Sequence, residues 1–145
     1  MKQNSEEFNQ IFVVSFLKKL QISGLDFEFW HTPNGGSRNK SEAGRLKLMG
    51  VLSGVPDLCL MAYNIFAFIE FKTGKGKISK QQEEFIQKSS RYGWPVYTVY
   101  TDNPSDAINQ VGKIMMDSFG ARQNSISSIS ASVLSSSILD GSEKS

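Results

Sequence analysis

Apolar and polar positions alternate with two different periods along this chain. From about residue 5 to residue 20 the apolar side chains recur on one face, which predicts a helix that is capped by Asn4 or Ser5 and ends before Gly24. Residues 26–32 alternate in the manner of a strand. The remaining pattern predicts, in order, a short helix at 41–49, strands at 57–63 and 65–71, a helix at 79–92, a strand at 95–100 and a helix from about 103 to 119.

Specific residues mark the starts of the last two helices. Ser79 and Gln82 have the spacing of a capping box, in which each side chain bonds the backbone N–H of the other residue. Pro104 suits the first position of the last helix, because proline has no N–H to leave unpaired there. The helices that flank the strand at 95–100 therefore have well-defined starts.

This order of elements predicts an α/β domain with a mixed central β-sheet flanked by helices. The strands at 57–63 and 65–71 form an antiparallel hairpin that turns at Tyr63 and Asn64. The strand at 95–100 lies beside the second hairpin strand, because the intervening helix supplies a right-handed crossover.

Length and composition predict one domain and a tail. A chain of 145 residues has the size of one domain and can bury a core without disulfides. Ten of the 25 residues from 121 to 145 are serine. This composition predicts a disordered tail after a folded domain at 1–120.

The stretch from residue 54 to residue 72 carries the candidate chemistry. Asp57 precedes an almost wholly apolar run that ends at Glu70 and Lys72. Side chains alternate along a strand, so Glu70 and Lys72 point the same way, and hairpin pairing brings Asp57 beside Glu70. Two carboxylates suit Mg²⁺ or Mn²⁺, and Lys72 could orient a water or stabilise developing charge. The alternative is an ordinary solvated ion pair at a strand end, because Glu-x-Lys is common on its own.

Other residue types exclude several classes of site. The chain has one cysteine, Cys59, and one histidine, His31, so it can form neither an internal disulfide nor a Cys/His zinc site. A single thiol inside an apolar strand predicts a core position and a reducing compartment, the cytoplasm. The polar, acidic start is unlike a signal peptide, and no apolar run reaches the roughly 18 residues of a membrane span. The chain contains neither a phosphate-binding P-loop nor a GxSxG nucleophile elbow.

Positive charge flanks the carboxylates. The net charge of the chain is only +2, but residues 31–50 carry four positive side chains and one negative, and residues 70–91 carry six and three. Each stretch has a net charge of +3, a layout that favours contact with a phosphate backbone. Ordinary surface lysine is the alternative explanation.

Four segments together resemble the VRR-NUC domain, a branch of the PD-(D/E)XK nuclease superfamily. They are PNGG-x-R at 33–38, EAGRLKLMGVLSGVPDLCL at 42–60, IEFKTGKGKIS at 69–79, and the following Gln82. The similarity spans roughly residues 6–110 and leaves out the serine-rich tail. It implies a restriction-endonuclease-like core and a Mg²⁺- or Mn²⁺-dependent endonuclease that acts on DNA.

The resemblance assigns roles to four residues of the hairpin. It implies that Asp57, Glu70 and the backbone carbonyl of Phe71 bind the metal ion. It also implies that Lys72 assists the attacking water.

The resemblance implies two further contributions from helices. A glutamate in the first helix, followed four residues later by Gln or Glu, often completes the site, and Glu6 with Gln10 fits this spacing. Glu7 is the competitor, although its spacing from Asn4 is also that of a capping box. A glutamine often follows the E-x-K strand, and Gln82 matches it in addition to capping a helix.

Contacts to DNA are also implied. Asn34, Arg38 and Lys47 lie at family-like positions for phosphate contact. The lysines that follow the E-x-K strand are assigned the same role: Lys75, Lys77 and Lys80. His31 is a further candidate, although a lone histidine at a strand end more often packs or faces solvent.

The resemblance further implies a preference for branched, flapped or nicked DNA, and stand-alone domains of this kind often work as homodimers. So small a chain suggests a phage or other mobile-element origin, which would place the protein in the host cytoplasm. Two alternatives stay open. One is a catalytically silent nucleic-acid-binding module of the same fold, and the other is a restriction-type endonuclease that reads a fixed sequence.

Overall fold

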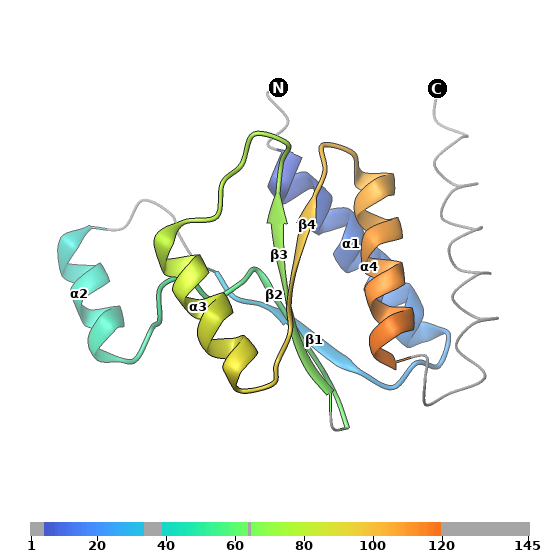
Figure 1. Cartoon of the computed structure of the whole chain (residues 1–145), viewed down its shortest axis with the longest axis horizontal. Helices are drawn as coiled ribbons and strands as arrows, with labels where there is room; N and C mark the ends of the chain where they lie inside the picture. The colour runs from blue at the N-terminus through green and yellow to red at the C-terminus, as the bar shows by residue number, and fades with distance from the viewer. Residues whose placement is uncertain (1–4, 34–38, 64, 120–145) are drawn as a thin grey trace.

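The computed structural model describes residues 5–33, 39–63 and 65–119, and its elements follow the predicted order (Figure 1). They are α1 (Ser5–Ile22), β1 (Glu28–His31), α2 (Lys40–Leu48), β2 (Leu58–Ala62), β3 (Ile65–Lys72), α3 (Lys80–Arg91), β4 (Val96–Tyr100) and α4 (Pro104–Phe119). β1 is shorter than predicted, because its pairing with β2 covers only Glu28 to His31. Asn64 and the predicted tail at 121–145 lie outside the described residues, so the division into a domain and a tail stays a prediction.

The four strands form one mixed sheet in the order β1-β2-β3-β4. β1, β2 and β3 are antiparallel neighbours, and β3 and β4 are parallel, which confirms the predicted hairpin and the predicted place of β4. The hairpin register pairs Leu58 with Ile69, and its turn includes Tyr63 at a φ of 44°. Continued by one residue, the same register sets Asp57 beside Glu70 at the open end of the hairpin.

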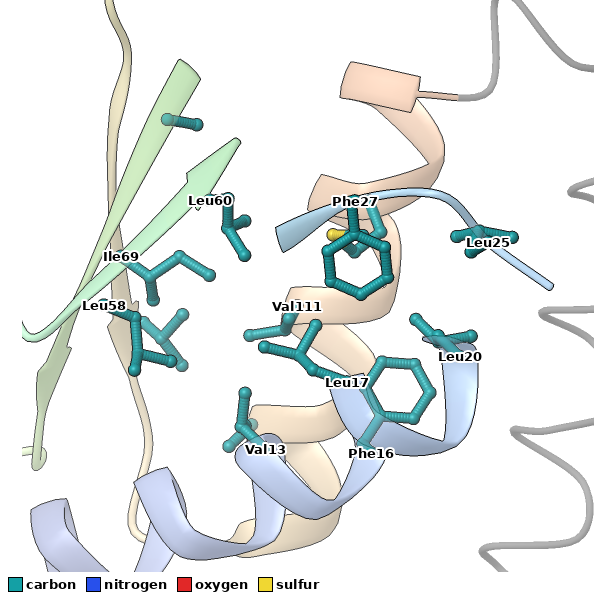
Figure 2. Packing of buried hydrophobic residues seen from close by; sticks show 14 of the residues in the cluster. Val13, Phe16, Leu17, Leu20, Leu25, Phe27, Leu58, Leu60, Ile69 and Val111 are labelled. Carbon is teal, nitrogen blue, oxygen red and sulfur yellow. The ribbon is translucent and has the colours of Figure 1, made fainter. Parts of the chain in front are cut away.

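α1 and α4 pack together on one face of the sheet and bury the main core (Figure 2). Val13 and Leu17 of α1 and Val111 of α4 lie in one cluster with Leu58 and Ile69 of the hairpin, and all five are buried. Full burial of an aliphatic side chain contributes about 1.5–3 kcal/mol relative to exposure. The hairpin that carries the candidate residues therefore rests on a well-packed base.

The opposite face of the sheet, called the outer face below, carries the candidate site. Ile69 points into the core, and side chains alternate along β3. Phe68, Glu70 and Lys72 therefore point to the outer face. α3 covers part of that face, because the ring of Phe85 lies 5.1 Å from the ring of Phe68. Figure 1 shows α1 and α4 on one side of the sheet and α2 and α3 on the other.

α2 takes no part in the core. None of its residues is buried, and the helix stands apart from the sheet in Figure 1. Its start is set by Asn39, whose side-chain oxygen accepts a hydrogen bond from the backbone N–H of Glu42 at 2.8 Å. The start of this helix is therefore set by a local cap contact and not by core packing.

Candidate active site

Two backbone contacts hold Asp57 at the open end of the hairpin. Its carboxylate oxygen Oδ2 accepts a hydrogen bond from the backbone N–H of Phe71 at 2.8 Å. Its carbonyl oxygen accepts another from the backbone N–H of Thr32 at 2.9 Å. The carboxylate is thereby fixed to β3, and the loop before β2 is tied to the end of β1.

Glu70 and Lys72 form an ion pair on the outer face. Nζ of Lys72 lies 2.8 Å from Oε1 of Glu70, and the Glu70 side chain is only 3% exposed. Gln82 of α3 also donates a hydrogen bond from Nε2 to Oε1 of Glu70. Oε1 of the same Gln82 accepts a bond from the backbone N–H of Ser79 at 2.8 Å, which completes the predicted capping box. Gln82 therefore both caps α3 and contacts the site.

α1 contributes Glu6 to the same place. Oε1 of Glu6 accepts a hydrogen bond from the backbone N–H of Thr73 at 3.2 Å, and Glu6 lines the same cleft as Asp57 and Glu70. Glu7 is exposed. The structure thus brings Glu6 to the predicted site, while Asn4, the capping partner weighed for Glu7, lies outside the described residues.

His31 and Gln10 lie next to Asp57 without lining the cleft. Nδ1 of His31 is 2.8 Å from the carbonyl oxygen of Asp57 and 2.8 Å from Nε2 of Gln10. The imidazole is exposed. Nδ1 either donates to the Asp57 carbonyl oxygen or accepts from the Gln10 amide, and the ring lies between α1 and the backbone at Asp57.

Burial raises the pKa of both carboxyl groups. For Asp57, loss of solvent outweighs the hydrogen bond from Phe71 and the charge of Lys72, which lower the pKa. For Glu70, loss of solvent and the charge of Asp57 outweigh the hydrogen bond from Lys72. Burial lowers the pKa of Lys72, but its hydrogen bond and attraction to Glu70 outweigh this and leave the pKa raised. A further positive charge beside the two carboxyls would favour their ionised forms.

The charged residues open into a cleft of about 850 Å³ between α2 and α3. α2 contributes Lys47 to one wall, and α3 contributes Phe85 and Lys88 to the other. The acids and the buried lysine line the same cleft: Glu6, Asp57, Glu70 and Lys72. The cleft therefore combines carboxylates, of which Glu70 is buried, with lysines on both walls.

Gly54 sets how closely the loop before Asp57 approaches α3. Its φ is 83°, in the left-handed region that favours glycine. A Cβ at this position would lie 2.3 Å from the carbonyl oxygen of Gln81. Glycine is therefore required here both for its backbone conformation and for space.

The predicted DNA-contacting residues separate into three groups. Lys47 lines the cleft. Lys75, Lys77 and Lys80 are exposed and lie outside the cleft lining, on the loop and first turn that follow β3. Asn34 and Arg38 lie outside the described residues.

The loop after β3 is held at two points. Glu6 accepts from the backbone N–H of Thr73, and Oδ1 of Asp102 accepts from that of Gly74 at 3.1 Å. The lysines of this loop, Lys75 and Lys77, are thus carried on an anchored backbone. Asp102 lies two residues before the first residue of α4.

Sequence reasoning missed Phe85 and Lys88 as cleft residues. Both lie on α3 at three and six positions after Gln82, and Lys88 lies seven after Gln81. Residues three, four and seven apart share one face of a helix. By this spacing the predicted role of Gln82 at the site points to Phe85, three positions on, and Phe85 in turn points to Lys88, three further on.

The oxygen donors at this site suit a hard divalent cation only when waters and substrate phosphates supply its remaining ligands. Within the described ranges, no group of three or more His, Cys, Asp or Glu side chains is gathered as a metal site. The hydrogen bonds above engage Oδ2 of Asp57 and Oε1 of Glu70, one oxygen of each carboxylate. Mg²⁺ is commonly bound by one or two carboxylates together with waters and substrate phosphates. The buried carboxylate of Glu70 and the half-buried carboxylate of Asp57, which line one cleft, fit that mode of binding.

Comparisons with known proteins give a matching family and a similar solved structure. A family model for the VRR-NUC domain matches residues 15–103. A solved structure named "VRR_NUC domain protein" is similar over 83% of this chain and 92% of that chain, with 21% identity and a TM-score of 0.56. No curated protein matches this chain.

The chain belongs to the VRR-NUC domain family, a family of nuclease domains. The resemblance drawn from the four sequence segments is thereby confirmed, and so is the α/β fold with a mixed sheet and flanking helices. A nuclease domain implies a nucleic acid substrate. None of the described helices is both long enough and apolar enough to cross a membrane.

Proposed function

We propose that the protein is a divalent-metal-dependent endonuclease that hydrolyses DNA phosphodiester bonds. The observation that carries this proposal is the meeting of Asp57, Glu70 and Lys72 in one cleft, on a hairpin that belongs to a nuclease family. An ordinary strand-end ion pair would be solvated. Glu70 is instead buried and held by partners from β3 and α3.

Asp57 and Glu70 would hold Mg²⁺ or Mn²⁺, with the carbonyl of Phe71 and the carboxylate of Glu6 as further oxygen donors. When bound, such an ion lowers the pKa of a water and offsets the charge of the phosphate. Loss of solvent raises the pKa of Asp57 and Glu70, and carboxylates that have lost solvent gain more from a cation than solvated ones.

Lys72 would hold a proton beside the reacting phosphate. Its raised pKa keeps the ammonium charged at neutral pH, and the bond to Glu70 fixes its direction. A positioned positive charge in a site with little water stabilises the charge that develops during attack on phosphorus. The Gln82 amide would keep the Glu70 carboxylate from turning away.

The substrate class follows from the cleft and from the family. Lys47 and Lys88 line opposite walls and suit phosphate groups on both sides of a strand. Selectivity for branched, flapped or nicked DNA is proposed by analogy with the family. A homodimer would place two such sites on two strands.

The test is cleavage of a branched DNA by purified protein with Mg²⁺. We expect the wild type to cut, chelation with EDTA to stop cutting, and Asp57→Asn and Lys72→Ala to lower the rate by about 100-fold or more. DNA binding by Asp57→Asn should be retained, because the variant removes no positive charge.

Two results would redirect the proposal. If wild type and Lys72→Ala show the same background rate, the protein is a silent nucleic-acid-binding module. If random duplex is cut into discrete bands, the protein reads a fixed sequence and is a restriction-type enzyme.

A further inference from the structure

Five aromatic rings form a continuous row on the outer face of the sheet. The ring of Trp30 in β1 lies 5.9 Å from that of Phe66 in β3. Phe66 lies 4.9 Å from Phe68 and 6.0 Å from Trp94. Phe68 in turn contacts Phe85 of α3 at 5.1 Å. These five residues are called the aromatic row below.

The row leads from the cleft to the surface. Phe85 lines the cleft, and Phe68 is buried beneath α3. Trp30 and Trp94 are each 40% exposed, and the neighbouring Met61, on the same face, is 44% exposed. The far end of the row is therefore an apolar surface that stays open to solvent.

The strand register sets the row close to the candidate site. Trp30 pairs with Cys59, and Cys59 pairs with Phe68, so the three form one rung across the sheet. Asp57 and Glu70 occupy the rung two residues further along, on the same face. At about 3.3 Å per residue, the two rungs are about 7 Å apart.

We propose that the exposed tryptophans of the aromatic row, Trp30 and Trp94, stack the unpaired bases of a single-stranded DNA segment next to the candidate site, an inference that rests on the proposed function. Aromatic faces bind bases of any sequence, and a basic groove beside them tracks the phosphates. Here the basic residues are Lys47 and Lys88 of the adjoining cleft. A nucleic acid strand presents bases and phosphates side by side, and it matches both surfaces at once.

The first experiment uses the two tryptophans of the chain, which both belong to the row. Asp57→Asn protein, which should bind without cutting, is titrated with oligothymidylate and its intrinsic fluorescence is followed. We expect quenching on binding. A strand of the same length that lacks bases but keeps all its phosphates should bind about fivefold more weakly or worse.

Substitutions in the same background then locate the contact. Trp30→Leu should weaken oligothymidylate binding by about fivefold or more, while Trp30→Phe, which keeps an aromatic face, should stay near the parent. Phe12→Leu is the matched control, because Phe12 is 42% exposed on α1, away from the outer face. Melting curves of all variants separate loss of binding from loss of folding.

Each outcome supports or overturns this inference or the proposed function. Equal binding of the two strands, with no quenching, overturns the inference. A fluorescence change on concentration without DNA, together with a doubled molecular mass, overturns it in favour of a second copy on this surface. Base-dependent quenching together with a wild type that cuts no DNA would overturn the proposed function, while base binding by the row would still be supported. Cleavage by the wild type, with binding that does not depend on bases, would overturn this inference and support the proposed function.

Discussion

The side-chain amide of Gln82 joins the start of α3 to the carboxylate of Glu70. Its oxygen accepts from the backbone N–H of Ser79, and its nitrogen donates to Glu70. The capping box fixes the amide on the backbone side, so the donor that faces the site is fixed as well. One side chain thus has two roles: it caps a helix and it orients a site carboxylate.

Two substitutions separate these roles. Ser79→Ala removes the hydroxyl of the cap and should cost about 1 kcal/mol of unfolding free energy, with cleavage near wild type. Gln82→Leu also loses the cap and should show a similar cost, but cleavage should fall about tenfold or more because Glu70 loses its partner. Urea denaturation and single-turnover cleavage measure the two quantities. Equal cleavage rates in both variants would show that Gln82 is only a cap.

The raised pKa of Asp57 predicts how stability depends on pH. The folded state holds the Asp57 proton more tightly than the unfolded chain, because burial disfavours the charge. This contribution to stability is present below about pH 4 and is lost as the pH rises through the folded pKa. Asp57→Asn keeps an oxygen for the Phe71 N–H and carries no charge. Without metal, it should melt at a higher temperature than wild type at neutral pH.

The measurement is a series of melting curves from neutral pH down to about pH 4 in EDTA. The advantage of Asp57→Asn should shrink as the pH falls, because the wild-type carboxyl becomes neutral too. A constant difference across the series would mean that the stability change has another origin. Added Mg²⁺ should raise the melting temperature of wild type alone, since a ligand of the folded state stabilises it.

The close approach at Gly54 can be tested against a second glycine. Gly54→Ala should lower the unfolding free energy by more than about 2 kcal/mol, since it adds a backbone clash to the cost of a positive φ. Gly50 has a φ of 93°, and a Cβ there would meet nothing within 4 Å. Gly50→Ala should therefore cost only the roughly 1–2 kcal/mol of the conformation. Similar midpoints in urea for the two variants would argue against the clash.

Lys47 should contribute to DNA affinity through charge alone. Lys47→Ala should weaken binding of all sequences about equally and lower the slope of log K against log salt by about 0.9. Lys18, exposed on α1 and outside the cleft lining, provides the control, because Lys18→Ala makes the same charge change away from the cleft. If both variants shift the slope equally, the effect belongs to net charge and not to the cleft.

The apolar pattern was sufficient for the element order and for the hairpin. Alternation along the second hairpin strand and its end predicted that Glu70 and Lys72 share a face, and the antiparallel register then brought Asp57 beside them. Both predictions depend on the period of a strand and on a short turn, which are local properties. The bounds of β1 were less accurate, because they depend on how much of β2 it pairs with.

The sequence by itself determined the features that depend on residues close together in the chain: the strand faces, the capping box at Ser79 and the paired acids of the hairpin. The tertiary structure decided which distant side chains join them. Glu6 reaches the backbone of Thr73 across 67 positions of the chain, and Phe85 enters the cleft because α3 packs on the outer face. Such contacts depend on the distances between packed elements, and no period within one element encodes those distances.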